Sequence, residues 1–464
     1  MGIKINTKET FWWILSAMLF VGVWLFFWQV HPEWLSFQEQ NQLFLCTDDY
    51  LFERWSVAGG IADWLGEFIV QFFYVEWLGA LLMALLLLLM QRMGCLAFVW
   101  KGKGHYSSLI SHFTFLLSFL PPLFFLWLFG DENVLVAMPV AVTLLLAAVA
   151  LLRRTRWLWW WLIILPSLWS VGQCSQRIGP QWTNFYRIPQ RGPSLSGWET
   201  EKWELLKQDY LIRNERWTDV LKRAKDRTVT TPFWSNSVNL SLAMTGQLAS
   251  RQFEYWQSGE DALIMPMVRD NVSNLPTMEA FWRLGMVNSA LRYASDIQES
   301  ILNARKSGRL EKRIIECLIV NGQYTIARKH LALLKKTLFY RSWAEDAERL
   351  LDHEDQIAAH PVWGRLRQLR YKQNFLYSYA EIDKMLGILF QNNTQNKMAL
   401  EYFLSQLLLK GDAQTFMQAL PWAQQYGDYP QMPQGYEDAV VCMRTQPVPD
   451  SPYGRYVKRM LGGH

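Results

Sequence analysis

Residues 318–331 read LIVNGQYTIARKHL, and this stretch decides how the second half of the chain is interpreted. Gly322, Tyr324 and Ala327 stand at the spacing glycine-x-aromatic-x-x-alanine. Glycine accepts the left-handed backbone of a tight turn at little cost. The large residue and the small one can then pack a second helix against the first. The stretch therefore predicts two antiparallel helices joined at Gly322.

Four other segments place residues at the same offsets, although with departures from the pattern. The matches start, in chain order, at Glu215 with Trp217, at Gly246, at Gly285 with Ala290, at Gly322 and at Gly411. The first three intervals are 31, 39 and 37 residues, and the last, of 89, leaves room for about two irregular units. Because a tetratricopeptide repeat has about 34 residues, we predict an α-solenoid of tetratricopeptide-like repeats over residues 201–445. The alternative is an irregular helical bundle with coincidental glycine turns.

Residues 1–171 form a different, sparsely charged region. They hold 9 basic and 11 acidic residues, whereas residues 172–464 hold 37 and 30, which is the charge density of a soluble domain. Apolar stretches near residues 11–30, 69–90, 109–130, 134–152 and 157–171 predict about five transmembrane helices in an all-α protein. The first is too long for a cleavable signal peptide and lacks a small-x-small cleavage site, so we expect a retained anchor.

The basic residues around these stretches predict the orientation. Eight lie before the first stretch, between the second and third, or between the fourth and fifth, whereas the alternate loops hold only Arg54. By the positive-inside rule the N-terminus is cytoplasmic and, after five spans, the C-terminal domain is periplasmic. We therefore expect a multi-pass protein of the bacterial inner membrane. The fifth stretch has only 15 residues, and with four spans the repeat domain would be cytoplasmic.

The loop after the first stretch and the start of the second stretch carry four acidic residues of interest. Asp48 and Asp49 are adjacent and could hold a divalent ion, although a solvated loop pair is the commoner case. Glu67 lies on a predicted helix whose apolar residues recur at helical spacing, which suits a helix in the membrane interface. Glu76 falls within the second apolar stretch, where a carboxylate is a functional candidate, unless the span begins near Val75.

The remaining chemistry-bearing residues indicate no catalytic or metal site. The five cysteines include no CxxC pair, and the seven histidines include no pair at helical spacing. No phosphate-binding loop or nucleophile motif occurs, so we predict no cofactor and lean against an enzyme. Residues 172–200 are rich in glycine, proline and serine and predict a linker, and residues 446–464 predict a loosely ordered tail.

Charge also bears on the partner. The basic residues of the repeat region are interleaved with acids, as on ordinary helix surfaces, and a domain outside the cytoplasm would not meet nucleic acid. An anionic glycan or a lipid headgroup is a better electrostatic partner than nucleic acid.

Four stretches together resemble an uncharacterised family of bacterial multi-pass inner-membrane proteins. They are residues 40–81 (QNQLFLCTDDYLFERWSVAGGIADWLGEFIVQFFYVEWLGAL), 281–294 (FWRLGMVNSALRYA), 321–340 (NGQYTIARKHLALLKKTLFY) and 382–393 (IDKMLGILFQNN). The resemblance implies an inner-membrane location with a helical repeat tail, and it brings no catalytic residues. Members often have a longer membrane region, which puts a full transport or transferase core in doubt.

These patterns favour a membrane-anchored scaffold whose repeat domain binds a protein partner. The alternative is a membrane-embedded enzyme or transporter fragment acting on a lipid-linked or sugar substrate through Asp48, Asp49, Glu67 and Glu76.

Overall fold

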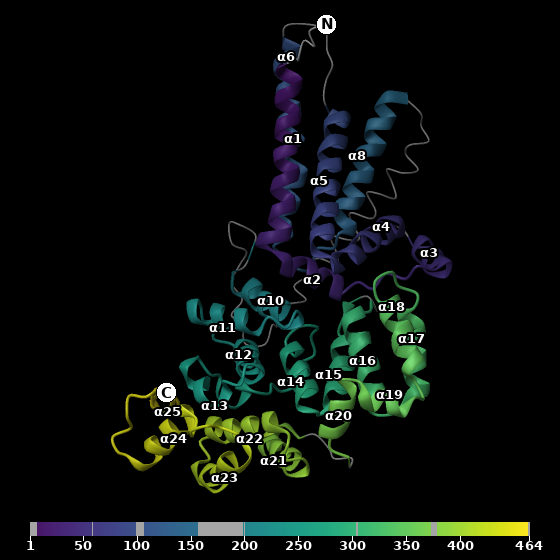
Figure 1. Cartoon of the computed structure of the whole chain (residues 1–464). Helices are drawn as coiled ribbons and strands as arrows, with labels where there is room; N and C mark the ends of the chain where they lie inside the picture. Colours follow the sequence, from purple (N-terminus) through teal and green to yellow (C-terminus); the bar gives the residue numbers. More distant parts are fainter. Residues whose placement is uncertain are drawn as a thin grey trace, which may run out of the picture.

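The computed structural model describes residues 7–57, 59–98, 106–155, 198, 200–302, 305–372 and 378–462. Within these residues the regular structure is helical, with no strand, as the all-α prediction expected. Figure 1 shows an upright group of helices that carries the N-terminus and a larger body of shorter helices that carries the C-terminus. We call residues 7–155 the apolar half and residues 200–462 the C-terminal half.

The apolar half consists of upright helices and a set that lies across their lower ends. Its elements are α1 (Thr7–Leu25), η1 (Phe26–Val30), α2 (Pro32–Gln40), α3 (Asp48–Trp55), α4 (Gly60–Val70), η2 (Gln71–Tyr74), α5 (Glu76–Phe98), α6 (Tyr106–Leu117), α7 (Leu120–Leu128) and α8 (Ala137–Thr155). Both α1 and α8 pack on α5. In Figure 1, α2, α3 and α4 cross beneath these upright helices.

The structure revises the predicted spans. Among the described residues two helices are long and apolar enough to cross a membrane, Thr10–Val30 and Glu76–Phe98, and two shorter apolar helices are His112–Leu128 and Ala137–Arg153. The expectation of about five long spans is therefore wrong for the described part of the chain, and the fifth stretch, 157–171, lies outside it.

Two local features explain the revision. The span predicted at 69–90 is displaced because Val75 is extended, so that α4 ends at Val70 and the long helix α5 begins at Glu76. The span predicted at 109–130 is divided between α6 and α7. Pro121 and Pro122 stand in the first turn of α7, and neither has the N–H that would continue α6.

The C-terminal half is a succession of short helices in which neighbours along the chain pack on one another. They are α10 (Thr200–Arg213), α11 (Trp217–Asp226), α12 (Pro232–Met244), α13 (Leu248–Arg251), η4 (Gln252–Glu254), η5 (Gly259–Ala262), α14 (Leu275–Leu284), α15 (Val287–Glu299), α16 (Gly308–Val320), α17 (Tyr324–Leu334), α18 (Arg341–Leu350), α19 (Glu354–Ala359), α20 (Trp363–Leu369), η7 (Tyr379–Glu381), α21 (Ile382–Asn392), α22 (Lys397–Lys410), α23 (Ala413–Tyr426), α24 (Gln434–Arg444) and α25 (Pro452–Gly462).

The end of the chain differs from the loosely ordered tail expected at residues 446–464. Residues 452–462 form α25, where Tyr453 and Tyr456 are buried and their hydroxyls donate to the carbonyls of Leu408 and Leu409 on α22. The aromatic rings supply the buried apolar surface that orders the segment. Of the predicted linker, 172–200, the structure describes only Trp198 and Thr200.

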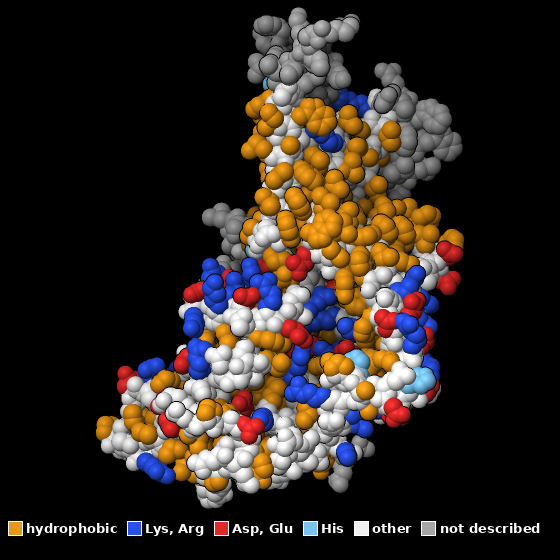
Figure 2. Space-filling view, viewed as in Figure 1, with side chains coloured by type: hydrophobic (Ala, Val, Ile, Leu, Met, Phe, Trp, Pro, Cys, Tyr) orange, Lys and Arg blue, Asp and Glu red, His pale blue; other side chains and the backbone are white. Residues whose placement is uncertain are grey.

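Side-chain chemistry separates the two halves as clearly as their helices do. Figure 2 shows apolar side chains covering the visible face of the apolar half, whereas basic and acidic side chains are interspersed over the C-terminal half. The two halves meet at α2, and this junction positions the candidate site.

Candidate functional site at the junction of the two halves

Helix α2 is enclosed on all sides although half of its residues are polar. Every residue of PEWLSFQEQ except Ser36 is buried. The Trp34 ring contacts Phe27, Phe73 and Phe129 of the apolar half, with centroid separations of 4.7, 5.8 and 4.8 Å. Some polar side chains of α2 bond within the apolar half, such as Gln38, which donates to the carbonyls of Glu132 and Val134, and others reach the C-terminal half.

The C-terminal half supplies the partners of Glu39 and Gln40. Arg213 donates to Glu39 at 2.6 Å, and the Tyr340 hydroxyl donates to the other oxygen of the same carboxylate at 2.8 Å. Burial alone would lower the pKa of Arg213, but the Glu39 carboxylate beside it raises that pKa above its ordinary value. Burial and Glu39 together raise the pKa of Tyr340, which keeps its proton and remains a donor.

A second buried pair lies one turn further along the junction. Arg309 of α16 makes two hydrogen bonds to Asp209 of α10, at 2.7 and 3.0 Å, and a third to the Gln40 amide oxygen at 2.6 Å. Arg309 and Asp209 are each only 8% exposed in their side chains. A buried charge that lost its partner would cost several kcal/mol, about 3–5. The pair therefore fixes α2, α10 and α16 in one arrangement.

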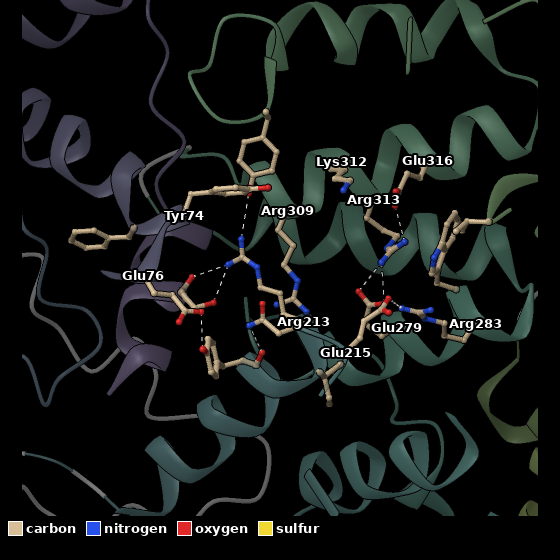
Figure 3. A pocket seen from close by; sticks show the side chains of 18 residues that line it. Tyr74, Glu76, Arg213, Glu215, Glu279, Arg283, Arg309, Lys312, Arg313 and Glu316 are labelled. Carbon is tan, nitrogen blue, oxygen red and sulfur yellow. Dashed lines mark hydrogen bonds and ion pairs between the residues drawn. The ribbon is translucent and has the colours of Figure 1, made fainter. Parts of the chain in front are cut away.

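A cleft of about 430 Å³ opens beside these contacts. Its walls come from α10, α14 and α16 of the C-terminal half and from the region around Tyr74 and Glu76, at the start of α5. Figure 3 shows the charged side chains pointing into it, with Arg313 between Glu279 and Glu316. The three C-terminal helices are each the first of a helix pair, so the cleft lies on one common side of those pairs.

Most charges in the cleft are paired with each other. Arg313 bonds Glu279 at 2.8 and 2.9 Å and Glu316 at 2.7 Å, and Arg283 pairs with Glu215. Burial would raise the pKa of Glu279, but Arg313 outweighs burial and holds that pKa below its usual range. Glu279 therefore stays charged at neutral pH, and the ion pairs form fixed walls of the cleft.

Two charged groups in the cleft lack an ion-pair partner within the described part of the chain. Lys312 lies 4.9 Å from the centre of the Trp343 ring, a cation–π contact. Glu76 accepts a hydrogen bond from the Tyr210 hydroxyl at 2.7 Å. The cleft thus offers one cation and one carboxylate between aromatic side chains. Such a surface can bind a polypeptide segment that carries charges of both signs.

The four acids singled out from the sequence do not converge. Asp48 and Asp49 are exposed in the first turn of α3, where negative charge favours the helix. Glu67 is buried and accepts from Arg54 at 3.1 Å, and only Glu76 lines the cleft. No group of three or more histidine, cysteine, aspartate or glutamate side chains suited to a metal ion occurs among the residues described.

The residues predicted at repeat turns occupy turns and helix contacts. The φ angle is positive at all five turn positions, 54° at Glu215 and 67°, 83°, 75° and 74° at Gly246, Gly285, Gly322 and Gly411. Each joins two consecutive helices.

The other residues of the pattern lie in the second helix of their pair. Ala290 and Ala327 are fully buried. Trp217 and Tyr324 begin α11 and α17, and the Tyr324 hydroxyl donates to Glu354 on α19.

Sequence reasoning missed a sixth turn and the whole of α2. Asp352, with φ of 67°, joins α18 to α19 inside the interval between Gly322 and Gly411 that was left unassigned. Its signal was the buried Ile357, which stands where Ala327 stands relative to Gly322. For α2 the signal was Pro32 followed by Glu33, a combination common in a first helical turn.

Comparison with known proteins identifies the family but no activity. A model described as Family of unknown function (DUF6057) matches residues 7–177 and 178–458, so the chain belongs to this family. The match extends over both halves. No curated protein and no solved structure matches the chain.

Proposed function

We propose that this protein is a membrane-anchored scaffold that binds a polypeptide partner in the bacterial cell envelope. Its C-terminal half acts as an α-solenoid of tetratricopeptide-like repeats, held outside the cytoplasm by a multi-pass anchor in the inner membrane. The junction cleft receives the partner. The observation that carries the proposal is a cleft with charges of both signs, fixed against the apolar helices by the buried contacts of α2.

Exposure of the apolar half supports membrane insertion. The most apolar window of helix Thr10–Val30 is only 17% buried, and its exposed side chains include Trp13 and Met18. A helix from the core of a soluble protein would bury most of that window. Lipid chains make such exposure favourable, because they do not penalise apolar surface as water does.

The placement of basic residues supports the orientation. Arg92 and Arg153 lie near the ends of α5 and α8 that point away from the C-terminal half (Figure 1). Arg92 stacks on Trp13 near the start of α1, so these ends lie beside the N-terminal end of the chain. Under the positive-inside rule this side is cytoplasmic, and the C-terminal half is periplasmic.

The two described residues that flank residues 156–197 also favour this arrangement. Thr155 ends α8 at the side remote from the C-terminal half, whereas the Trp198 indole donates to the Leu126 carbonyl near the end of α7, at 3.0 Å. The flanks thus lie toward opposite ends of the apolar helices, as a crossing by residues 157–171 requires.

Site-specific photo-crosslinking in the full chain tests the scaffold proposal. A photo-reactive phenylalanine replaces Lys312 in the cleft or Arg349, an exposed residue of α18, in living cells. We expect position 312 to yield one discrete protein adduct that Glu76→Lys abolishes, because the substitution reverses a charge of the cleft. Position 349 should yield none. Absence of an adduct at 312, or equal adducts at both positions, contradicts the proposal.

Two native thiols test the orientation. Cys46 is exposed on the side of the C-terminal half, and Cys95 lies near the far end of α5. Cells with an opened outer membrane are treated with an impermeant thiol reagent, one cysteine being retained at a time. We expect labelling of Cys46 alone, with Cys95 reacting after permeabilisation. The reverse order would place the C-terminal half in the cytoplasm.

A further inference from the structure

Helices α3 and α4 form a hairpin with an unusual amount of exposed apolar surface. Phe52, Trp55, Val57 and Ile61 are each more than half exposed, between 51% and 66%, and Phe68 follows at 39%. Large contiguous apolar patches on proteins mark sites that contact a partner or a membrane. Figure 1 shows both helices lying across the direction of α1, α5 and α8. The hairpin is therefore parallel to the bilayer plane if those helices cross it.

The hairpin is held rigidly in this position. Glu67 of α4 accepts hydrogen bonds from the Tyr50 hydroxyl at 2.5 Å and from Arg54 at 3.1 Å, both on α3. Arg305 of the C-terminal half lies 3.1 Å from the same carboxylate. The contact among these four side chains faces inward, so the apolar side chains on the opposite side remain outward as a fixed surface.

A loop of the C-terminal half continues this surface. Residues 335–340, between α17 and α18, place the Phe339 ring 5.8 Å from Phe72 and 5.3 Å from Tyr74. The neighbouring Leu338 is 49% exposed. The Lys336 carbonyl also accepts from the Cys46 amide, at 2.7 Å, just before α3. The loop is thus joined to the hairpin both through aromatic rings and through the backbone.

Basic side chains border the apolar surface. Lys306, Lys329 and Lys336 line an open hollow of about 370 Å³ together with His330 and Glu311. The only carboxylate among the described residues of the hollow, that of Glu311, is hydrogen-bonded to the Nδ1 atom of His330, with 2.7 Å between the nitrogen and the oxygen. Within the described part of the chain none of the three lysines forms an ion pair. Three unpaired cations beside an exposed apolar surface are what an anionic membrane interface attracts.

We propose that the α3–α4 hairpin and the α17–α18 loop form one surface that lies in the bilayer interface, with the three lysines on anionic lipid headgroups. This inference rests on the membrane placement in the proposed function. It extends that function because it gives the C-terminal half its own contact with lipid, independent of the cleft and of any protein partner.

Continuity with the apolar half argues for a bilayer as the occupant. The exposed residues Tyr74 and Trp77 stand close to the start of α5, where the chain passes from the hairpin into an upright helix. Tyrosine and tryptophan are enriched at the two interfaces of a membrane, where one end of the ring is apolar and the other hydrated. In Figure 2 the apolar side chains extend without interruption from the upright helices onto the hairpin.

Depth-dependent fluorescence quenching in proteoliposomes tests the placement of the loop. A fluorophore is attached to Leu338→Cys in the full chain, with Leu85→Cys on α5 as the membrane reference and Ile388→Cys on α21 as the aqueous reference; the native residues are 49%, 45% and 42% exposed. We expect lipids brominated near the headgroup to quench position 338, lipids brominated deep in the chains to quench position 85, and neither to quench position 388.

The outcomes separate this inference from the proposed function. If position 85 is quenched and position 338 behaves as position 388 does, the interfacial surface is refuted and the anchor remains. If position 85 is not quenched either, the membrane placement itself is refuted, and with it both the membrane-anchored scaffold and the interfacial surface.

Lipid competition tests the role of the lysines. The ratio of association constants for anionic over neutral spin-labelled lipid is measured for the full chain and for Lys306→Gln/Lys329→Gln/Lys336→Gln. Each lysine near an anionic surface contributes roughly fivefold in affinity, so we expect the ratio to fall by at least fivefold. The matched control, Arg349→Gln/Lys384→Gln/Arg455→Gln, removes three exposed cations elsewhere and should leave it unchanged. An unchanged ratio in the first variant would refute headgroup binding.

Discussion

The two halves of the molecule differ in the side chains that their helices expose and bury. Helix α1 exposes Phe11, Trp13 and Met18 by 53%, 65% and 64%. Helix α12 does the reverse and buries a polar series, whose members are Ser235, Asn236, Ser237, Asn239 and Ser241, each at 0% exposure. Helix propensity alone therefore does not decide which side chains a helix exposes and which it buries.

The polar series of α12 is stable because each of its side chains makes at least one hydrogen bond inside the protein. The Asn239 amide donates to Gln257 at 2.7 Å and to the Ala262 carbonyl at 2.9 Å. Ser237 and Ser241 donate to carbonyls one turn earlier in the helix, at 2.8 and 2.9 Å. Buried polar groups cost free energy unless they are hydrogen-bonded, so α12 is a well-connected interior helix.

The largest test of this comparison removes one charge where the halves meet. Arg309→Met leaves Asp209 buried without its counter-charge, and we expect the free energy of unfolding to fall by about 3–5 kcal/mol. Chemical denaturation of the full chain in detergent micelles measures the loss. Limited proteolysis should cut sooner near the junction, since α2 also loses the hydrogen bond to Gln40.

Two control variants show whether the loss in Arg309→Met comes from an unpaired buried charge. Arg309→Met/Asp209→Leu removes both charges and should recover most of the loss, because no unpaired ion remains. Arg216→Met breaks a pair with Asp219 whose side chains are 52% and 42% exposed, and it should change stability by less than about 1 kcal/mol. If Arg309→Met were as mild as Arg216→Met, the junction would not depend on its buried ions.

A second test concerns the cost of polar burial within the C-terminal half. Glu401 of α22 is 7% exposed, and burial raises its pKa from 4.5 to about 7, against the opposing hydrogen bond from Tyr429. The folded state binds the Glu401 proton more tightly than the unfolded state. The contribution of Glu401 to the free energy of unfolding is therefore largest below pH 4.5 and falls as the pH rises to about 7. The loss amounts to about 3 kcal/mol.

The variant Glu401→Gln separates this effect from all other titrations. It keeps an oxygen that can accept from Tyr429 and carries no charge. We expect it to match the parent chain near pH 5 and to unfold at a higher temperature near pH 8, as thermal denaturation would show. An equal melting temperature for the two chains at both pH values would exclude Glu401 as the source.

Much of the secondary structure could be predicted from sequence because its signals are local. Glycine at positions 246, 285, 322 and 411 marks left-handed turns directly. Glu215 was found only through its spacing, and Asp352 was missed because residues other than glycine are uncommon where the backbone is left-handed. The apolar stretches located the long helices, but the extended Val75 and the prolines of α7 moved their boundaries.

The junction could not be predicted because its partners are distant in sequence. Glu39 meets Arg213 and Tyr340, which lie 174 and 301 residues away. Nothing in PEWLSFQEQ distinguishes an enclosed helix from a hydrated polar loop until those two partners are placed around it. The same holds for the cleft, where Glu76 was identified as a candidate acid and Lys312 was not.

The smallest expected change in stability comes from replacing one glycine in each half, because glycine has a different role in each. A Cβ on Gly66 of α4 would lie 2.6 Å from the Ala137 amide nitrogen, so this glycine permits close packing of α4 on α8. Gly322 has no atom within 4 Å of such a Cβ but requires a left-handed backbone, with φ of 75°. Gly66→Ala must displace backbone and should cost about 1–3 kcal/mol, whereas Gly322→Ala should cost about 1 kcal/mol.

Denaturation of both alanine variants in one detergent compares the two costs, and thiol cross-linking between α4 and α8 reports their separation. We expect Gly66→Ala to weaken that cross-link and Gly322→Ala to leave it intact, because only the first substitution acts between helices. Close approach at small residues is how helices associate in lipid, where no hydrophobic effect drives them together. A tolerated Gly66→Ala would therefore mean that the apolar half is held together as water-soluble proteins are, by buried apolar side chains, and the contrast with the C-terminal half would disappear.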